Sequence, residues 1–324
     1  MKTLSISRPH FYDEQAAYAY VEKLLWPKGP VCPHCGSTTR IKPLKGKSTR
    51  IGLYKCYVCR KPFTVKIGTI FEDSHIPMHK WVQGIYLMCA SKKGISSNQL
   101  HRTLDISLKS AWFLSHRLRE AMRSGDLTPF GANGGIVESD ETFIGMEPGA
   151  KKRPGFIHKR KVLSLIDRTS GHARSMVIDA VDAKTIVPIL QENIDKEARV
   201  MTDDAGQYRH LHEDFAEHGV VQHSNGEYVS MNDRTVHVNC AENFFSVFKR
   251  GMKGIYQHCK KQHLHRYLAE FDFRYNNRCG RPKTKKRPAR EGFTDTQRAE
   301  ILLKGVVGRR LTYQTTHRQE GVMN

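Results

Sequence analysis

The sequence lacks any apolar run long enough to cross a membrane. Its 324 residues contain no stretch of about 18 apolar residues, the length that a transmembrane helix needs. The N-terminal segment MKTLSISRPHFYDEQ also lacks the apolar core of a secretory signal. These absences predict a cytoplasmic protein with no membrane partner. In that reducing compartment, the eight cysteines are expected to bind metal or to stay as free thiols.

Acidic residues are scarce relative to basic ones. The chain has 53 Lys and Arg against 32 Asp and Glu, which gives a formal net charge of +21. Between Val31 and Phe71 there is no acidic residue, although nine basic residues fall in that interval. A solvated surface normally mixes both signs, so this composition favours a polyanionic partner, and nucleic acid is the commonest one. The nine are Arg40, Lys42, Lys45, Lys47, Arg50, Lys55, Arg60, Lys61 and Lys66.

The cysteines in this basic region have the spacing of a zinc site. Cys32 and Cys35 form one C-x2-C pair, Cys56 and Cys59 form another, and 20 residues separate the pairs. Zinc sites with four thiolates typically have about 15–20 residues between such pairs. The pattern predicts one structural Zn2+, since four protein ligands leave the ion no open position for chemistry. Two disulfides are the alternative, which the reducing context disfavours.

Residues 77–123 carry the pattern of a helical cluster. The first predicted helix is amphipathic and covers 77–91. A short second helix covers 97–104 and can be capped by Ser96 or Ser97. A third covers 108–122 and can be capped by Ser107. Two capped helices with a tight link predict a helix-turn-helix, whose second helix would read DNA. The alternative is a helical hairpin that binds nothing. The candidate DNA contacts on the third helix are Lys109, Ser110, His116 and Arg117.

From Gly134 onward the pattern changes to short strands. Predicted or candidate strands cover 136–145, 161–171, 172–181, 198–206 and 220–225. The second and third of these are expected to form a hairpin joined at 169–171. Helical patterns follow later, and acidic residues lie at the ends of two strands. This order fits an α/β fold with a ribonuclease-H-like core, a mixed sheet flanked by helices.

Three carboxylates fall on separate elements of this core. Asp140 lies on the first strand, Asp203 ends the fourth, and Glu242 lies on a helix predicted over 237–258. Carboxylates that converge can hold two metal ions about 3.5–4 Å apart for phosphoryl transfer, and all-oxygen ligands suit Mg2+ or Mn2+. Lys249 follows Glu242 by two helical turns, on the same face, where a cation can hold a phosphate. The adjacent acids that strand alternation leaves open are Glu138, Glu141 and Asp204.

Two further basic runs flank the core. The run over 151–161 follows the first predicted strand, and the run over 278–290 has seven basic residues and no acid. Either could lie along a DNA backbone, and for the second a disordered basic tail is an equal alternative. The DNA-contact candidates in these runs and beside Lys249 are Lys151, Lys152, Arg153, Arg250, Arg281, Lys283 and Lys285.

Several segments together resemble bacterial insertion-sequence transposases of the zinc-ribbon DDE group, often called ISXO-type. They are WPKGPVCPHCGS, GTIFEDSHIPMHKW, KKGISSNQLHRTLDISLKSAWFLSHRLREAM, SDETFIG, TDDAGQY, HVNCAENFFSVFKRGMKGIYQH and HLHRYLAEFDFRYNNR. The resemblance implies that Asp140, Asp203 and Glu242 are the three acids of the active site. It also implies that Lys249 is the basic residue that follows the third acid, and that the core has the ribonuclease-H-like fold.

The resemblance further implies a DNA transposase that binds terminal repeats, cleaves the 3′ ends of its element and joins them to target DNA. Two Mg2+ (or Mn2+) ions per active site, a nucleoid-associated location and at least a dimer are expected, because two ends must be processed together. The alternative is a non-catalytic zinc-ribbon and helix-turn-helix DNA-binding regulator on a nuclease-like core. The predicted domains are 1–75 (N-terminal helix and zinc ribbon), 76–128 (helix-turn-helix), 129–277 (catalytic) and 278–324 (basic tail).

Overall fold

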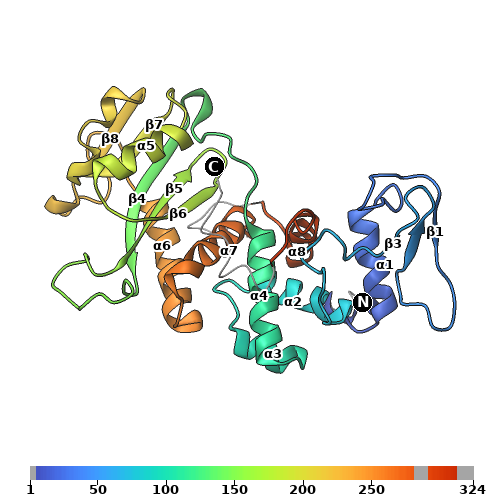
Figure 1. The fold of residues 1–324 in the computed structure, drawn as a ribbon. Coiled ribbons are helices and arrows are strands. Elements are labelled where there is room, and N and C mark those ends of the chain that lie inside the picture. Colours follow the sequence, from blue (N-terminus) through green and yellow to red (C-terminus); the bar gives the residue numbers. More distant parts are fainter. Residues whose placement is uncertain (1–4, 281–290, 312–324) are drawn as a thin grey trace. The chain divides into compact units, whose positions relative to one another are not determined.

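The computed structural model describes residues 5–280 and 291–311 (Figure 1). The chain divides into two compact units. The first unit combines Met1–Met122 with Cys279–Asn324, and the second is Arg123–Arg278. Among the described residues, no helix has the length and apolar character needed to span a bilayer.

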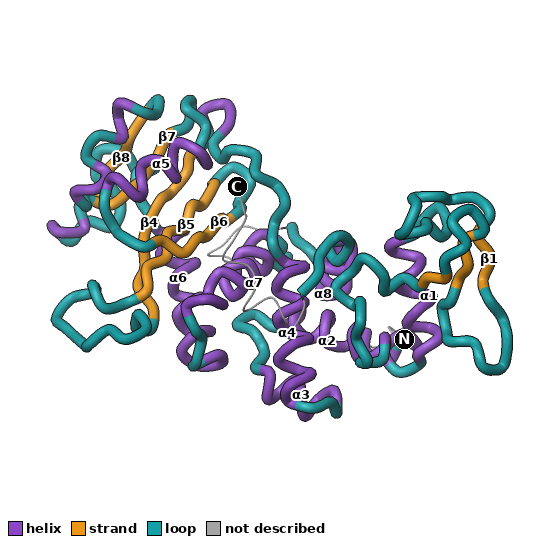
Figure 2. The backbone as a smooth tube through the Cα atoms, in the orientation of Figure 1, coloured by secondary structure: helices purple, strands orange, loops and turns teal. Residues whose placement is uncertain are grey.

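The first unit begins with a helix and a small sheet. Helix α1, Glu14–Leu25, starts at Asp13, whose carboxylate accepts a hydrogen bond from Ala16 N–H. Strands β1 (Ile41–Pro43), β2 (Tyr54–Cys56) and β3 (Pro62–Phe63) form an antiparallel sheet in the order β1-β2-β3. The tube in Figure 2 shows how short these strands are compared with the loops that join them.

The helical cluster of the first unit agrees closely with the predicted one. It contains α2 (Met78–Ala90), α3 (Ser97–Leu104) and α4 (Leu108–Met122). The hydroxyl of Ser96 accepts from Gln99 N–H at the start of α3, and that of Ser107 accepts from Ser110 N–H at the start of α4. Asp105, in the left-handed region at φ 49°, reverses the chain between α3 and α4. The helix-turn-helix is therefore confirmed as a structural element.

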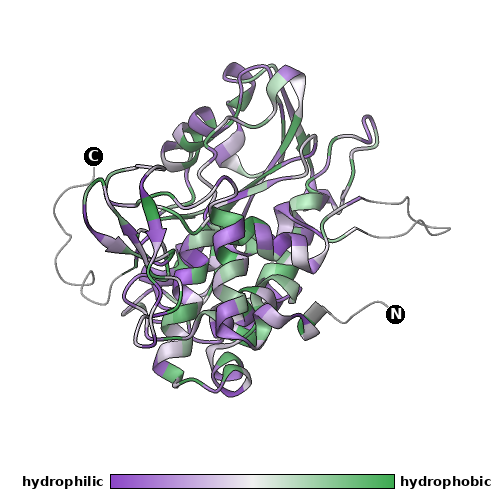
Figure 3. Cartoon of the chain, turned by 90° about the vertical axis from the view of Figure 1, so that its right-hand side faces the viewer, coloured by the Kyte–Doolittle hydropathy of each residue, from purple (hydrophilic) through white to green (hydrophobic). Residues whose placement is uncertain are grey.

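A further helix lies within the segment predicted as a basic tail. Helix α8, Asp295–Lys304, starts at a capping box between Thr294 and Gln297. Its residues Leu302 and Leu303 are fully buried, and the helix packs against α1, α2 and α4. Residues 295–304 thus belong to the helical cluster. Hydrophobic and hydrophilic residues alternate along the helices in Figure 3, as expected where one face of each helix is covered.

The second unit is built on a five-stranded mixed sheet in the order β6-β5-β4-β7-β8. Neighbours β4–β5 and β5–β6 are antiparallel, whereas β4–β7 and β7–β8 are parallel. This arrangement is the predicted ribonuclease-H-like core. The strands are β4 (Ile136–Ile144), β5 (Arg160–Asp167), β6 (Ala173–Ile178), β7 (Arg199–Asp203) and β8 (Glu217–Val221).

Helices cover both faces of this sheet. On β5, Val162 and Ile166 pack with α6 and α7, whereas the alternating residues Leu163 and Leu165 pack with α5. The α7 side chains also cover the outer edge of β6: Asp272 accepts from Ser175 N–H at 2.8 Å, and Asn276 accepts from Ala173 N–H at 2.6 Å. The helices are α5 (Ala183–Asn193), α6 (Asn239–Gly251) and α7 (Leu264–Asn276).

Helix α6 is shorter than the helix predicted over 237–258. It begins at Asn239 and passes into a π-helical turn over Met252–Tyr256. Its apolar residues Phe244, Phe248 and Met252, at four-residue steps, form a stripe that is buried against the sheet and α7. Because this stripe covers one face of α6, the polar side chains of the helix must lie on its other faces.

Candidate active site and zinc site

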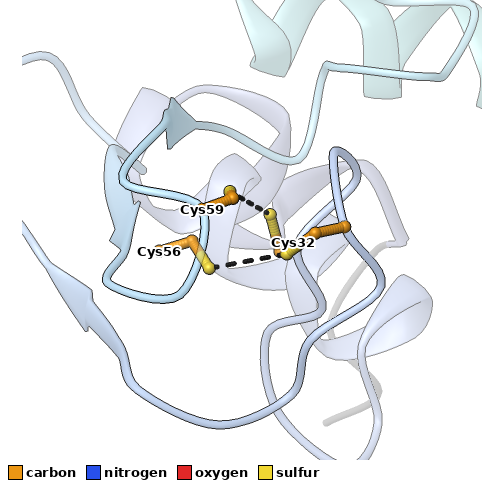
Figure 4. A group of neighbouring side chains, drawn as sticks. Cys32, Cys56 and Cys59 are labelled. Carbon is orange, nitrogen blue, oxygen red and sulfur yellow. Dashed lines mark hydrogen bonds between the residues drawn. The ribbon is translucent and has the colours of Figure 1, made fainter.

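The four cysteines of the two C-x2-C pairs converge on one point. Their sulfur atoms all lie within 4.8 Å of one another, and Figure 4 shows the side chains of Cys32, Cys56 and Cys59 pointing inward. The Cys32–Cys59 and Cys35–Cys56 sulfur distances are 3.6 and 3.8 Å. A tetrahedral zinc with Zn–S bonds of about 2.3 Å separates its sulfurs by about 3.8 Å, so the cysteines fit Zn2+ without rearrangement. A disulfide, with sulfurs about 2.05 Å apart, does not fit these distances.

An aromatic cluster supports the zinc site from one side. Trp26, at the end of α1, packs edge-on against Tyr54 and Phe63, with ring centroids 5.7 and 5.8 Å away. Tyr54 and Phe63 belong to β2 and β3, which also carry Cys56 and lead into the loop of Cys59. The sheet, the helix and the metal site therefore stabilise one another.

The proposed catalytic acids come from the three elements expected. Asp140 lies on β4, Asp203 ends β7, and Glu242 lies in the first turns of α6. Strands β4 and β7 are parallel neighbours, and their last paired residues are Glu138 and Met201. Asp140 and Asp203 each lie two residues beyond that pair, so they occupy corresponding positions on adjacent strands.

The charges of these acids interact. Burial is the main reason that the pKa of Asp140 is raised to about 8. The negative charges of Glu141, Asp203 and Glu242 raise that pKa further. Burial also raises the pKa of Asp203. A group of nearby carboxylates that repel one another while partly shielded from water is suited to bind a divalent cation.

The acids differ from the cysteines in their donor atoms, which are oxygen rather than sulfur. Among the described residues, the four cysteine sulfurs gather within 4.8 Å of one another. The oxygen donors and their positions on three elements therefore fit Mg2+ or Mn2+ better than a single tetrahedral ion.

Family models identify two parts of the chain. Residues 133–276 match the ISXO2-like transposase domain, and residues 12–62 match the transposase zinc-ribbon domain. Both matches are to domains of transposases. The zinc-ribbon match includes all four cysteines, and the transposase-domain match includes Asp140, Asp203 and Glu242.

One curated relative matches most of this chain. It is an uncharacterized protein in the transposable element ISH50 of Halobacterium salinarum, 27% identical over 280 residues. The match covers 82% of this chain and 91% of the relative. A solved structure, the simian T-cell lymphotropic virus intasome in complex with PP2A regulatory subunit B56 gamma, matches with a TM-score of 0.27 and 11% identity. That match covers 60% of this chain and 65% of the intasome chain.

Two of the predicted DNA contacts are corrected by their burial. His116 and Arg117 on α4 are 0% and 4% exposed. The Arg117 guanidinium donates to the carbonyl oxygens of Ile70 and Glu72, at 2.6 and 2.7 Å. Its role in the structure is to hold a distant loop against α4. The helix pattern alone could not reveal this, because the covering segment lies far away in the sequence.

The other predicted DNA contacts differ in exposure. Lys109 is exposed, whereas Ser110 is partly buried and contributes its N–H to the Ser107 cap. The residues of the β4–β5 loop, Lys151, Lys152 and Arg153, are exposed. Arg250 is also exposed, and its guanidinium donates to the Ser246 carbonyl oxygen at 3.0 Å. Arg281, Lys283 and Lys285 lie outside the described residues.

Lys249 is electrostatically linked to the acids of the site. It is partly buried on α6, and burial lowers its pKa, while the negative charge of Asp140 acts in the opposite direction. The charges of Lys249 and Asp140 therefore interact, and a lysine cation is a suitable partner for a phosphate. A phosphate contact at Lys249 stays a prediction.

Sequence reasoning missed one residue of this site. His223 follows β8, and its Nε2 lies 3.8 Å from Glu242 Oε1. Its charge, when protonated, also lowers the pKa of Asp203, although less than burial raises it. The sequence predicts a strand over 220–225, whereas β8 ends at Val221 and the chain turns at His223. That turn brings the imidazole to the acids.

Proposed function

We propose that this chain is a DNA transposase that binds the terminal repeats of its element, cleaves their 3′ ends and joins them to target DNA. The observation that carries the proposal is the grouping of Asp140, Asp203 and Glu242 from β4, β7 and α6 in a ribonuclease-H-like core. Cleavage by water and joining by a 3′-hydroxyl are both in-line displacements at a phosphodiester. One active site can therefore perform both steps in sequence.

Each residue of the site has a distinct task in this mechanism. Asp140, Asp203 and Glu242 would hold two Mg2+ or Mn2+ ions and fix them relative to the sheet. The ions supply Lewis-acid stabilisation of the charge that develops on the phosphate and a site for activating the nucleophile. Lys249, close enough to Asp140 for their charges to interact, would bind a phosphate oxygen and orient the scissile strand.

Exposed cations in each unit offer surfaces for the DNA backbone. In the acid-free interval of the first unit, seven of the nine basic residues are exposed, whereas Lys55 and Lys66 are partly buried. In the second unit, the β4–β5 loop presents Lys151, Lys152 and Arg153. We assign these surfaces to phosphate contacts, which position DNA without reading its sequence. The seven exposed residues are Arg40, Lys42, Lys45, Lys47, Arg50, Arg60 and Lys61.

Cleavage of defined duplexes tests the function directly. Purified protein is incubated with Mg2+ and either a duplex that carries the element's end or a random duplex of equal length. A transposase is expected to nick the end-bearing duplex at a fixed position and to join the freed 3′-hydroxyl to a second duplex. Cutting of both duplexes without joining would indicate a general nuclease. Binding without cutting in Mg2+ or Mn2+ would indicate a DNA-binding regulator.

DNA affinity is expected to fall steeply with salt. Each neutralised phosphate contributes about −0.9 to the slope of log K against log salt, so the seven exposed cations together would give about −6. Fluorescence anisotropy between about 50 and 200 mM salt measures this slope. Replacing Lys45 and Lys47 with Ala should reduce the slope by about 2. Lys184→Ala, at an exposed position on α5, is the matched control. A flat salt response would show that these cations do not contact DNA.

The active complex is expected to contain at least two protomers. Two ends must be cut and joined as one event, so two active sites are needed in a single assembly. Light scattering of protein bound to end-bearing duplex measures the stoichiometry. A complex that holds two ends on one protomer and still completes joining would contradict this prediction.

A further inference from the structure

Glu138 is a buried carboxylate that lies on the same strand as Asp140. Its side chain is 0% exposed. Glu138 Oε2 accepts hydrogen bonds from the N–H groups of Cys240 and Ala241, at 2.8 and 2.9 Å. These are the second and third residues of α6, so the acceptor occupies the place of a helix cap.

Helix α6 has no capping side chain of its own. Val238 stands at the N-cap position and has no side-chain acceptor, so it makes no side-chain cap hydrogen bond. A helix start has four N–H groups without partners inside the helix, and a carboxylate there also interacts favourably with the helix dipole. The cap of α6 thus comes from β4, which ties the helix to that strand.

A second set of contacts fixes the segment that precedes α6. Arg168, next to the end of β5, donates from Nε to Glu138 Oε1 at 2.6 Å. Its terminal nitrogens donate to the carbonyl oxygens of Thr235 and His237. Together, Glu138 and Arg168 hold both the approach to α6 and its first turn against the centre of the sheet.

We propose that Glu138 is a positioning residue that sets the distance between the Asp140 and Glu242 carboxylates. Glu138 and Asp140 are two residues apart on β4, so their side chains leave the same face of the sheet. Glu242 directly follows the two residues that Glu138 caps. One strand therefore carries the first acid and also anchors the helix that carries the third. This inference rests on the proposed function, because it assumes that the acids bind the metal ions.

Mn2+ binding to the intact, zinc-loaded protein tests this role without relying on activity. Electron paramagnetic resonance measures free Mn2+ during a titration, and thermal unfolding is followed in parallel. Glu138→Ala is expected to weaken Mn2+ affinity about 10- to 100-fold, the range typical for residues that orient metal ligands. Glu138→Gln should have a smaller effect in the same direction, since its amide oxygen still accepts from the two N–H groups but loses the charge that pairs with Arg168.

Asp272→Ala is the matched control in the same unit. Asp272 on α7 also accepts two hydrogen bonds, from Ser175 N–H and Oγ–H, but it anchors α7 rather than α6. This variant is expected to lower the unfolding temperature while leaving Mn2+ affinity within about twofold of wild type, because an independent site contributes additively.

A double-mutant cycle separates positioning from general stability. If Glu138 acts through Glu242, adding Glu138→Gln to Glu242→Gln should weaken Mn2+ binding little further. Wild-type Mn2+ affinity in folded Glu138→Ala, or full additivity in the cycle, would overturn the inference. If the Ala variant does not fold, wild-type affinity in Glu138→Gln would overturn it instead. Failure of the wild-type protein itself to bind Mn2+ would count against the proposed function.

Discussion

Replacing Asp140 with Asn is expected to lower the rate of transposon-end cleavage by about a thousandfold or more, while the ends are still bound. The change removes a charge that would hold the metal ions but preserves the size of the side chain. Metal ions contribute several kcal/mol of transition-state stabilisation, and each 1.36 kcal/mol or so corresponds to a factor of ten in rate. Asp203→Asn and Glu242→Gln should have effects of the same order. Single-turnover cleavage of a labelled end, in Mg2+ and then in Mn2+, measures all three.

The structure identifies the best control for this experiment. Asp204 is exposed and accepts a hydrogen bond from Ser224 Oγ, so Asp204→Asn should cut normally. Glu138 and Glu141 are less suitable, because Glu138 is buried and Glu141 accepts hydrogen bonds from Tyr208 and Gln207. If Asp204→Asn were inactive and Asp203→Asn active, the second metal ligand would be Asp204 rather than Asp203. Cleavage by all three main variants would refute the proposed function.

Lys249→Ala should behave differently from the acid variants. It removes the proposed phosphate contact and leaves the carboxylates in place, so we expect weaker binding of the ends and partial activity. In the same single-turnover assay, the defect should shrink as the protein concentration increases, because the loss lies mainly in binding. A defect as severe as that of Asp140→Asn, unchanged at high concentration, would place Lys249 in the chemical step itself.

Replacing Cys56 with Ser is expected to release zinc and to unfold the zinc ribbon over residues 30–70. Zinc binding to structural thiolate sites contributes about 10–16 kcal/mol in small domains, far more than the stability that such a short sheet has without metal. Atomic absorption would measure zinc per chain, and limited proteolysis would detect unfolding of the segment. A shift in tryptophan emission would report exposure of Trp26, which packs on Tyr54 and Phe63.

Cys279→Ser provides the comparison for the zinc experiment. Cys279 is exposed and lies outside the group of converging sulfurs, so this variant should retain one zinc ion per chain. Full zinc occupancy in Cys56→Ser would show that the four thiolates do not form a single site. Loss of zinc with no change in proteolysis would show that the metal does not support folding.

Local signals in the sequence predict much of this structure. The caps at Ser96 and Ser107 and the C-x2-C pairs depend on residues only a few positions apart, so the sequence shows their patterns directly. The sequence also shows which acids lie on strands or at strand ends, because hydrophobic alternation locates the strands.

The errors arise where distant segments meet. Arg117 is a buried anchor because the loop that contains Ile70 covers it. The sequence presents Glu138 only as a neighbour of Asp140, whereas it caps a helix about a hundred residues away. His223 reaches the site only because β8 ends early. Helix α8 escapes prediction because its surroundings in the sequence are strongly basic, although its capping box is a local signal.

The contacts of α7 with the outer edge of β6 limit how copies of this chain can associate. An uncovered edge strand can pair with a strand of another molecule and extend its sheet across an interface. On β6, the N–H groups of Ala173 and Ser175 are already bonded to Asn276 and Asp272. A strand of another molecule therefore cannot pair with β6 at Ala173 and Ser175 unless the side chains of α7 first leave that edge.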